Sequence, residues 1–411
     1  MSKINDDKIV VVQVGARMHY AVPIIFEKLG VLNLFITDFY YKGNLGFLEY
    51  FPDFFNWKRL FTRVNSNLPE AKIYSINLIG IIYRVRIIMA RKRLNNYKIF
   101  LWAAKCINRI TLRRLKNHNI DFSAIYMFNS AGLELMEYYS GKKKLILEQC
   151  IAIHFLELEL LRNERDKFKE WENGKNDSKS MLEFIEREQE ELALADIIIC
   201  PSEFVEESVI SLNPIYREKT RVVPYGVSMS VIKSKPKIFC GTRPLKILTV
   251  GAVGLRKGSP YILEAAKHFG CKVEFTIVGD YSLISSDIVS ELFTHLTLVG
   301  QVNRDRVQEF YESADVFLLP SICEGSATVT YEAMQYGLPL IVTPNTGSVV
   351  RDGVEGIIIE AGSSSGVINA IHMLLNSPDL VNEYSSKVID RANYASLDSY
   401  CKRLAEVLIE E

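Results

Sequence analysis

The chain has 411 residues, of which 48% are hydrophobic and 24% are charged, and its formal net charge is zero. This length predicts two or three domains, and the composition excludes a disordered chain. The seven cysteines are scattered without the spacing of metal ligands, which favours free thiols in a reducing compartment. No apolar run suits a secretory signal or a spanning helix, so we expect a cytoplasmic protein.

The first half alternates short β-rich runs with helical stretches, which is the pattern of parallel sheets covered by helices. We expect strands at residues 8–14, 31–37, 123–128, 144–149, 196–200 and 220–224. The loop after the first strand holds Gly15, which allows a phosphate or an acceptor to approach the backbone. Arg17 and His19 follow it, and they either reach into a cleft to meet substrate or lie on the surface.

The charges of this half are segregated along the chain. Residues 58–116 hold fifteen Lys or Arg and one acid, whereas residues 147–207 hold seventeen acids and seven bases. The basic, aromatic stretch 51–116 suits peripheral contact with anionic lipid at the inner face of a membrane, or an amphipathic substrate; the alternative is a set of helices with solvated basic faces. We expect no nucleic-acid partner, because no nucleic-acid-binding module accompanies the charge.

A second alternating series begins after residues 230–244, a stretch of mixed charge with two prolines that predicts a linker. Its expected strands are residues 245–251, 272–279, 296–300, 314–320 and 338–343. We therefore predict an α/β protein with two doubly wound, Rossmann-like domains, 1–230 and 231–390, and a terminal helix over 391–411. Ligands bind beyond the carboxyl ends of parallel strands, so two such domains facing each other enclose a central cleft.

The stretch CEGSATVTYEAMQYGLPLIVT, residues 323–343, places two carboxylates eight positions apart. Glu324 directly follows a buried strand, where it would bond sugar hydroxyls, and Glu332 lies one turn into a helix, where it would bond a ribose. We expect Ser326 or Thr328 to cap this helix and the amides of 325–328 to be unpaired, as a site for phosphate. The small residues that would admit the ligand are Gly325, Ser326, Ala327 and Thr328.

A second feature is VGAVGLRKGSPYILEA, residues 250–265, in which a strand-to-helix loop carries Arg256 and Lys257. Two cations on such a loop suit a diphosphate and would stabilise a departing nucleoside diphosphate. An Arg-Lys pair on a loop is more often solvated surface. Here, however, the pair and the two glutamates occupy equivalent strand-to-helix junctions of one domain.

The second half resembles the retaining glycosyltransferases of family 4, which have the GT-B fold. The resemblance rests on GLRKG (254–258), GQV (300–302), SADVFLLPSICEG (313–325), YEAMQYGLPLIVT (331–343) and TGSVVRDGVEG (346–356). It covers residues 200–380 well. The first domain matches mainly by its alternation, by Gly15 and by PYGV at 224–227, where Tyr225 replaces the family's asparagine.

The resemblance implies catalytic roles for Glu324, Arg256 and Lys257, with the two cations taking the leaving-group charge. The implied donor-binding set is Gly15, Gly300, Val302, Gly325, Ser326, Ala327, Thr328 and Glu332, with the backbone at 300–302 facing the nucleobase. The implied reaction moves a sugar, with retention, from a nucleotide-diphosphate-sugar donor to a glycan or lipid-linked acceptor in surface polysaccharide or glycolipid assembly. No metal and no other cofactor are expected, and the terminal helix would cross back to the first domain.

The sequence departs from the family where many members carry a histidine at the end of a first-domain strand. KLILEQC, residues 144–150, offers Glu148 and Gln149 instead. Glu148 could bond a sugar hydroxyl or the acceptor, with its pKa raised by burial. His154 follows, either as a substitute for the missing histidine or as a buried or capping residue.

Two other functions fit the same architecture. A nucleotide-sugar epimerase or a phosphorylase shares the two-domain plan, because fold does not fix function. A non-catalytic glycosyltransferase-like subunit would bind a glycan or a partner without turnover. Such subunits tend to lose the glutamate pair or the basic pair, whereas this chain has all four residues.

Overall fold

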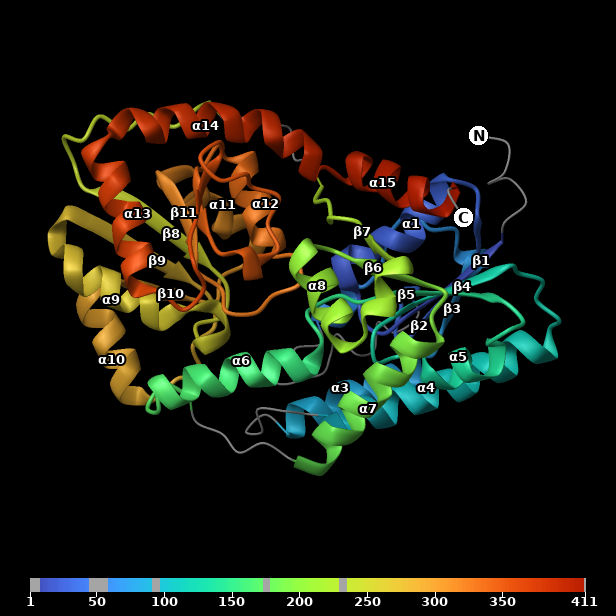
Figure 1. The fold of residues 1–411 in the computed structure, drawn as a ribbon. Coiled ribbons are helices and arrows are strands. Elements are labelled where there is room, and N and C mark those ends of the chain that lie inside the picture. Colours follow the sequence, from blue (N-terminus) through green and yellow to red (C-terminus); the bar gives the residue numbers. More distant parts are fainter. Residues whose placement is uncertain (1–7, 44–57, 91–96, 173–177, 229–234, 410–411) are drawn as a thin grey trace.

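The structure is a computed structural model, and it describes residues 8–43, 58–90, 97–172, 178–228 and 235–409. It consists of two α/β units side by side, blue to green and yellow to red in Figure 1. The first unit is built on a seven-stranded sheet in the order β3-β2-β1-β4-β5-β6-β7. Its strands are β1 (Ile9–Gln13), β2 (Leu32–Thr37), β3 (Ile73–Ser75), β4 (Ala124–Phe128), β5 (Lys144–Glu148), β6 (Ile197–Cys200) and β7 (Thr220–Val222).

The second unit is built on a six-stranded sheet in the order β10-β9-β8-β11-β12-β13. Its strands are β8 (Leu245–Val250), β9 (Val273–Val278), β10 (Thr297–Gly300), β11 (Val316–Leu319), β12 (Leu340–Val342) and β13 (Gly356–Ile358). The pairings within both sheets are parallel, which confirms the predicted fold class. Each predicted strand is present, whereas β3 and β13 were missed because each is a three-residue edge strand.

Both sheets reverse their strand order at one place. In the first sheet the chain runs outward from β1 to β3 and returns to place β4 beside β1, and in the second it runs from β8 to β10 and returns to place β11 beside β8. These central strands are mostly apolar and, apart from Lys246 of β8, buried, as in VFLL of β11, because helices cover both faces. Ligands of open parallel sheets bind at such switch points, so the loops after β1, β4, β8 and β11 are the places to look for a site.

The helices pack around these sheets. Those of the first unit are α1 (Ala21–Lys28), α2 (Lys58–Phe61), α3 (Asn77–Met89), α4 (Tyr97–Asn117), α5 (Leu133–Tyr139), α6 (His154–Lys167), α7 (Ser178–Leu194) and α8 (Glu203–Leu212). Those that follow are α9 (Ser259–Phe269), α10 (Ser286–His295), α11 (Arg304–Ser313), α12 (Thr328–Gln335), α13 (Ser364–Asn376), α14 (Pro378–Ala392) and α15 (Leu397–Ile409).

Two segments join the units on opposite sides (Figure 1). Helix α6 starts in the first unit, but Leu161 and Trp171, on it and just after it, belong to the hydrophobic core of the second unit. Helix α15 follows α14 back to the first unit, where the Arg403 guanidinium donates to the carbonyl of Pro224 at 2.8 Å. The first 230 residues therefore do not all pack in the first unit, because α6 crosses between the two.

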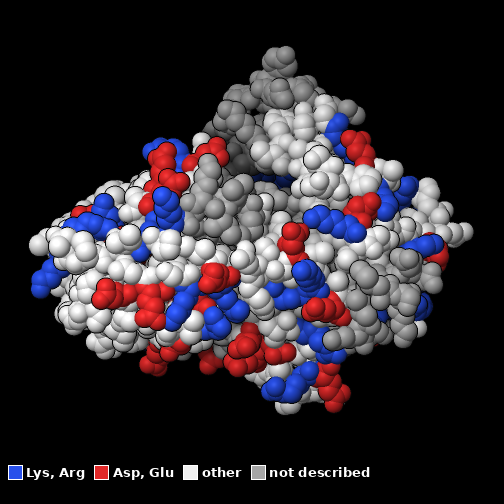
Figure 2. Space-filling view, turned by 90° about the horizontal axis from the view of Figure 1, so that it is seen from above, with Lys and Arg blue, Asp and Glu red and all other residues white. Residues whose placement is uncertain are grey.

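The segregated charges of the sequence meet inside the first unit. The basic helix α4 packs against the acidic helix α7, and Lys105 forms an ion pair with Glu183 at 2.5 Å. Figure 2 shows cationic and anionic residues interspersed on the face that it presents. Of the candidate membrane segment 51–116, residues 51–57 and 91–96 lie outside the described residues. Among the described residues, no helix is long and apolar enough to cross a membrane.

Candidate functional site

The switch point of the second sheet brings three of the predicted residues together. Arg256 and Lys257 lie on the short turn after β8, and Glu324 lies on the loop after β11, the neighbouring strand. The Lys257 ammonium is 2.7 Å from Glu324 Oε1, and the Arg256 guanidinium is 3.0 Å from the same oxygen. The backbone ties the loops as well, because the Ile322 amide donates to the Arg256 carbonyl at 2.9 Å.

These three charges differ in their exposure to solvent. The side chains of Glu324 and Lys257 are 10% and 12% exposed, whereas that of Arg256 is 38% exposed. Burial lowers the pKa of Lys257, although the Glu324 carboxylate opposes the shift. Burial also disfavours the charged form of Arg256, but nearby negative charge, chiefly that of Glu324, outweighs burial and raises the pKa of Arg256. The cluster therefore has two cations on one carboxylate, and an incoming anion can take the place of that carboxylate.

Glu332 faces a separate hollow of the second unit. Its carboxylate accepts from the Tyr311 hydroxyl at 3.2 Å, and Tyr311 stacks on Tyr336. The cavity has a volume of about 360 Å³, within the range of small-molecule sites. Its lining residues include Ser228, Val250, Val307, Tyr311, Glu332 and Tyr336. A carboxylate beside two flat rings suits a hydroxylated ring such as a ribose.

The predicted nucleobase region lies at the end of β10. Gly300 has a φ of +80°, which favours glycine, and its carbonyl accepts from the Gly279 amide at 3.0 Å. Val302 is half-buried against the hydrophobic core.

The small residues before α12 differ from the prediction. Ala327, not Ser326 or Thr328, is the N-cap residue, and no side chain caps the helix. The Ala327 amide donates to the Thr346 carbonyl at 3.1 Å, so the predicted row of unpaired amides is wrong at this position. The Ser326 hydroxyl lies 2.5 Å from that of Tyr331.

Gly325 is required for a contact between the units. A Cβ atom at this position would lie 1.8 Å from the backbone carbonyl oxygen of Cys150, which belongs to the first unit. Ser202, also of the first unit, donates its hydroxyl to the Gly325 carbonyl at 2.6 Å. The sequence did not indicate either partner, because the contact joins residues more than 120 positions apart.

The units also border a shared cavity of about 600 Å³. Its lining residues include Ser202, Phe204, Pro224, Asn345, Gly347 and Tyr394. The two units therefore face each other across a groove that begins at the Gly325 contact.

The loop after β1 contributes Gly15 at a φ of +82°. Its amide donates to Asp38 at 2.7 Å, and Asp38 in turn pairs with Arg63 at 2.9 Å. The Gly15 amide is thus engaged within the protein. His19 is exposed and has a φ of +51°, in the left-handed region. Sequence reasoning missed Asp38 and Arg63, for which no motif stands in the sequence.

Glu148 lies at the carboxyl end of β5, fully buried. Its two carboxyl oxygens accept from the hydroxyls of Tyr126 and Tyr225, each at 2.5 Å. Burial raises the pKa of Glu148, in the direction expected. His154 lies at the start of α6 and contacts Tyr97 at 2.5 Å and Glu157 at 3.0 Å through its two ring nitrogens. These contacts favour a structural role for His154.

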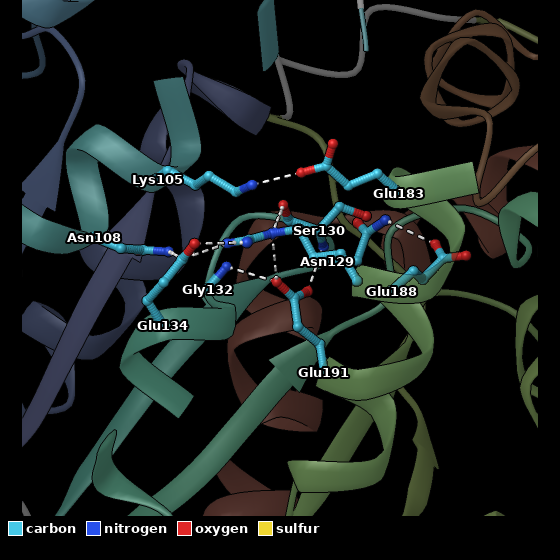
Figure 3. Close-up of polar contacts among 10 residues, drawn as sticks. Lys105, Asn108, Asn129, Ser130, Gly132, Glu134, Glu183, Glu188 and Glu191 are labelled. Atoms are coloured by element: carbon cyan, nitrogen blue, oxygen red, sulfur yellow. Dashed lines mark hydrogen bonds and ion pairs between the residues drawn. The ribbon is translucent and has the colours of Figure 1, made fainter. Parts of the chain in front are cut away.

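A buried acid network of α7 supports the loops after β4 and β5 (Figure 3). Glu188 accepts from the His154 amide at 2.6 Å and from the Gln149 side chain at 2.8 Å. Glu191 accepts from the amides of Ser130 and Gly132 at 2.5 and 2.8 Å. The sequence did not single out either acid, because this helix carries acids on several faces.

The part of the chain that carries this geometry matches a known protein family. Residues 244–377, which contain all three residues of the charge cluster, match the family model of Glycosyl transferases group 1. This part of the chain is therefore similar to the group 1 glycosyltransferases. It includes the cavity residue Glu332 as well.

Curated relatives of this region cover part of the chain. An uncharacterized glycosyltransferase of Methanocaldococcus jannaschii is 26% identical over 191 residues, 45% of this chain and 51% of its own. The UDP-Gal:alpha-D-GlcNAc-diphosphoundecaprenol alpha-1,3-galactosyltransferase of Escherichia coli is 30% identical over 193 residues, 40% and 48% of the two chains. The chain thus spans about half the length of these relatives.

Solved structures resemble the whole chain. HepE of Anabaena, in complex with UDP and glucose, has a TM-score of 0.58 at 14% identity and covers 98% of this chain and 100% of its own. Sucrose-phosphate synthase of Thermosynechococcus elongatus has a TM-score of 0.66 at 15% identity and covers 98% of both chains. At sequence identities of 14% and 15%, structural similarity shows that the folds agree. It confirms the GT-B fold expected from the sequence resemblance to family 4.

Proposed function

We propose that this protein is a glycosyltransferase that moves a sugar from a nucleoside diphosphate sugar to an acceptor and retains the anomeric configuration. The observation that carries the proposal is the convergence of Arg256 and Lys257 on Glu324 at the switch point of the region that is similar to group 1 glycosyltransferases. Two buried or half-buried cations on one carboxylate have the chemistry to receive a diphosphate. Two similar proteins support this choice. One is named as a galactosyltransferase with UDP-Gal as donor, and the other, HepE, has a structure in complex with UDP and glucose.

In the proposed reaction the donor diphosphate replaces Glu324 as the partner of Arg256 and Lys257. Glu324 then accepts hydrogen bonds from the donor sugar, Glu332 accepts from the ribose, and the backbone at 300–302 faces the nucleobase. The bond between the anomeric carbon and the phosphate oxygen breaks, and a bond to the acceptor oxygen forms on the same face. The departing phosphate takes the acceptor's proton, while the two cations stabilise its negative charge.

No metal ion or other cofactor takes part in this scheme, because the cation pair supplies the positive charge that the leaving group needs. The transfer rate with and without a chelator of divalent cations tests this part of the proposal. A rate that falls on chelation and returns with added Mg²⁺ or Mn²⁺ would contradict it.

The proposed acceptor is a glycan or a lipid-linked sugar in surface polysaccharide or glycolipid assembly. Similar proteins include the E. coli enzyme named for a diphosphoundecaprenol-linked sugar and a phosphatidyl-myo-inositol mannosyltransferase of Mycobacterium leprae. Helix α3 exposes Leu78 and Met89 at 70% and 79%, with Arg86 also exposed. This apolar and basic face suits peripheral contact with a lipid-linked acceptor.

Calorimetric titration of UDP, GDP and ADP into the wild type and Glu332→Ala tests the donor site. We expect one nucleotide to bind with micromolar affinity, about 8 kcal/mol, and the variant to bind it at least about tenfold more weakly, since a ribose would lose a carboxylate partner. Leu78→Ser, at an exposed position of helix α3 in the first unit, is the control and should bind as the wild type does. If no nucleotide binds, a non-catalytic glycan-binding protein becomes the better reading.

A further inference from the structure

The segment that follows helix α6 reaches the second unit at Glu172. Trp171 is buried in the core of that unit, and its carbonyl accepts from the Ser285 amide at 3.0 Å. Glu172 forms an antiparallel β-bridge with Ile284. The backbone thus fixes Glu172 on the second unit, although Glu172 lies outside residues 244–377, which match the family model.

The Glu172 carboxylate binds the turn that carries the two cations of the charge cluster. Its Oε1 atom accepts from the Leu255 amide at 2.9 Å, and Leu255 directly precedes Arg256. A Cβ atom at Gly254 would lie 2.9 Å from the same Oε1 atom. Gly254 has an extended φ of 164°, which any residue can adopt, so the close approach of Glu172 is what favours glycine there.

The turn Leu255–Lys257 is bonded both to Glu172 and to the loop that carries Glu324. From that loop, the Ile322 amide donates to the Arg256 carbonyl at 2.9 Å, and both cationic side chains reach Glu324 Oε1. A three-residue 3₁₀ turn forms few hydrogen bonds of its own, and their geometry is poor. Its position therefore depends on partners outside the turn, of which the Glu172 carboxylate is one.

The charge of Glu172 opposes an anionic ligand. A carboxylate bonded to the residue next to Arg256 lowers the positive potential that a diphosphate would meet. If charge were the main effect of Glu172, its removal would therefore strengthen diphosphate binding. A positioning role predicts the opposite sign, because a turn that has moved no longer presents Arg256 and Lys257 together.

We propose that Glu172 is a positioning residue of the donor site, which fixes, through the Leu255 amide, the turn that presents Arg256 and Lys257 to the donor diphosphate. This inference rests on the proposed function. It gives the segment after α6 a role in donor binding, through a residue that lies outside the region matched by the family model. It also accounts for Gly254, whose lack of a side chain admits the carboxylate.

The first test compares binding of UDP, GDP and ADP with binding of uridine, guanosine and adenosine, by titration calorimetry. For the base that binds, Glu172→Ala should weaken diphosphate affinity about 3- to 10-fold, as for one lost hydrogen bond, and leave nucleoside affinity within about twofold. Glu172→Gln should stay within about twofold of the wild type for both ligands, because its amide oxygen still accepts from Leu255. Glu170→Ala removes an equal charge from an exposed neighbour and is the matched control.

Gly254→Ala tests the same bond without changing Glu172. Its methyl group would lie 2.9 Å from Glu172 Oε1, and the flexible glutamate side chain would turn away, so diphosphate affinity should fall as it does in Glu172→Ala. The double variant should bind as weakly as either single variant, because both changes remove one bond. Losses that add in the double variant would contradict the proposal. Gly254→Ala decides the matter if Glu172→Ala fails to fold, which its thermal midpoint shows.

The outcomes separate this inference from the proposed function. If the wild type binds a nucleoside diphosphate and Glu172→Ala binds it as well or better, or loses nucleoside and diphosphate affinity together, the inference is overturned and the donor site stands. Equal losses in Glu172→Ala and Glu172→Gln would also overturn it, because the second variant keeps the acceptor. If the wild type binds no nucleoside diphosphate, the proposed function fails and the inference falls with it.

Discussion

The ionisation of Lys257 decides how the charge cluster responds to pH. Burial lowers the pKa of Lys257 despite the neighbouring Glu324, so its positive charge is lost at a lower pH than that of an exposed lysine. We expect nucleoside diphosphate affinity to fall as the pH rises, and to do so below the ordinary lysine pKa of about 10.4. Titration calorimetry from neutral pH up to this value measures the fall.

Lys257→Arg is the informative variant, because a guanidinium keeps its charge throughout this pH range. Its affinity should be nearly independent of pH, and Lys257→Met should lower the transfer rate by about 10²- to 10³-fold, as for other lost transition-state donors. If the affinity of Lys257→Arg and that of the wild type depend on pH in the same way, a group other than Lys257 titrates. The prediction for Lys257 is then wrong.

Individual residues of the site were predictable to different degrees. Arg256, Lys257 and Glu324 stand in recognisable motifs after predicted strands, and the structure brings the charged atoms of both cations within 3.0 Å of Glu324 Oε1. Gly325 was predicted to be small so that a ligand can approach, which stays a prediction, and the structure gives it a close neighbour that was not expected. The atom that excludes bulk is the Cys150 carbonyl, and a contact across the groove leaves no local pattern.

At the scale of elements, helix α7 shows why acidic composition alone does not predict a surface helix. Burial raises the pKa of Glu191 to about 8, well above its ordinary value of 4.5. The folded protein therefore holds a proton that the unfolded chain releases between these two pH values. Its contribution to stability is complete below about pH 4.5 and declines as the pH rises towards about 8.

Glu191→Gln should flatten this part of the pH profile. The wild type should lose stability by up to about 1.4 kcal/mol per pH unit through this group, measured as a falling thermal midpoint between pH 5 and 8. The variant should be less stable at every pH, because an amide cannot accept from both backbone donors and one unpaired group costs about 1–3 kcal/mol. The thermal midpoint of Glu191→Gln should fall less steeply with pH than that of the wild type. Glu190→Gln, a neighbouring exposed acid, should keep the wild-type slope.

The sequence predicts elements well where a pattern is long and poorly where an element takes its place from tertiary contacts. The runs that became β1 and β11 are almost continuously apolar, and that of β8 is apolar apart from Lys246 and Thr249. The edge strands β3 and β13 have three residues each, and they are ordered by pairing with β2 and β12. Helix α6 was expected within the first domain. Its second half packs on the other unit, where Glu164 accepts from the Tyr261 hydroxyl at 2.5 Å, and only such tertiary contacts show this placement.

At the scale of the molecule, helical connections and a close contact at Gly325 join the units within the described residues. The α6 and α14–α15 segments join them on opposite sides (Figure 1), and the Gly325 contact brings their facing loops together between those connections. The charge cluster and the Ser202 bond both adjoin this contact. Separation of the units at this contact would therefore move the first unit away from the loop that carries Glu324, as when domains open in enzymes that exclude water by closure.

Gly325→Ala should separate closure from folding. The added methyl group would lie 1.8 Å from the Cys150 carbonyl oxygen, which is backbone and has no rotamer to change, so the units must move apart. We expect a larger radius of gyration by small-angle X-ray scattering and at least a tenfold lower transfer rate. The thermal midpoint should change little, because the cores of both units are untouched.

Gly353→Ala is the control, since its Cβ would meet no atom within 4 Å and its φ of +67° costs only local strain. It should leave the radius of gyration unchanged. Ser202→Ala removes the hydrogen bond to the Gly325 carbonyl without adding bulk, and should have a smaller effect than Gly325→Ala in the same direction. Should Gly325→Ala keep both the wild-type radius and the wild-type rate, contact of the facing loops would not be what the transfer reaction requires.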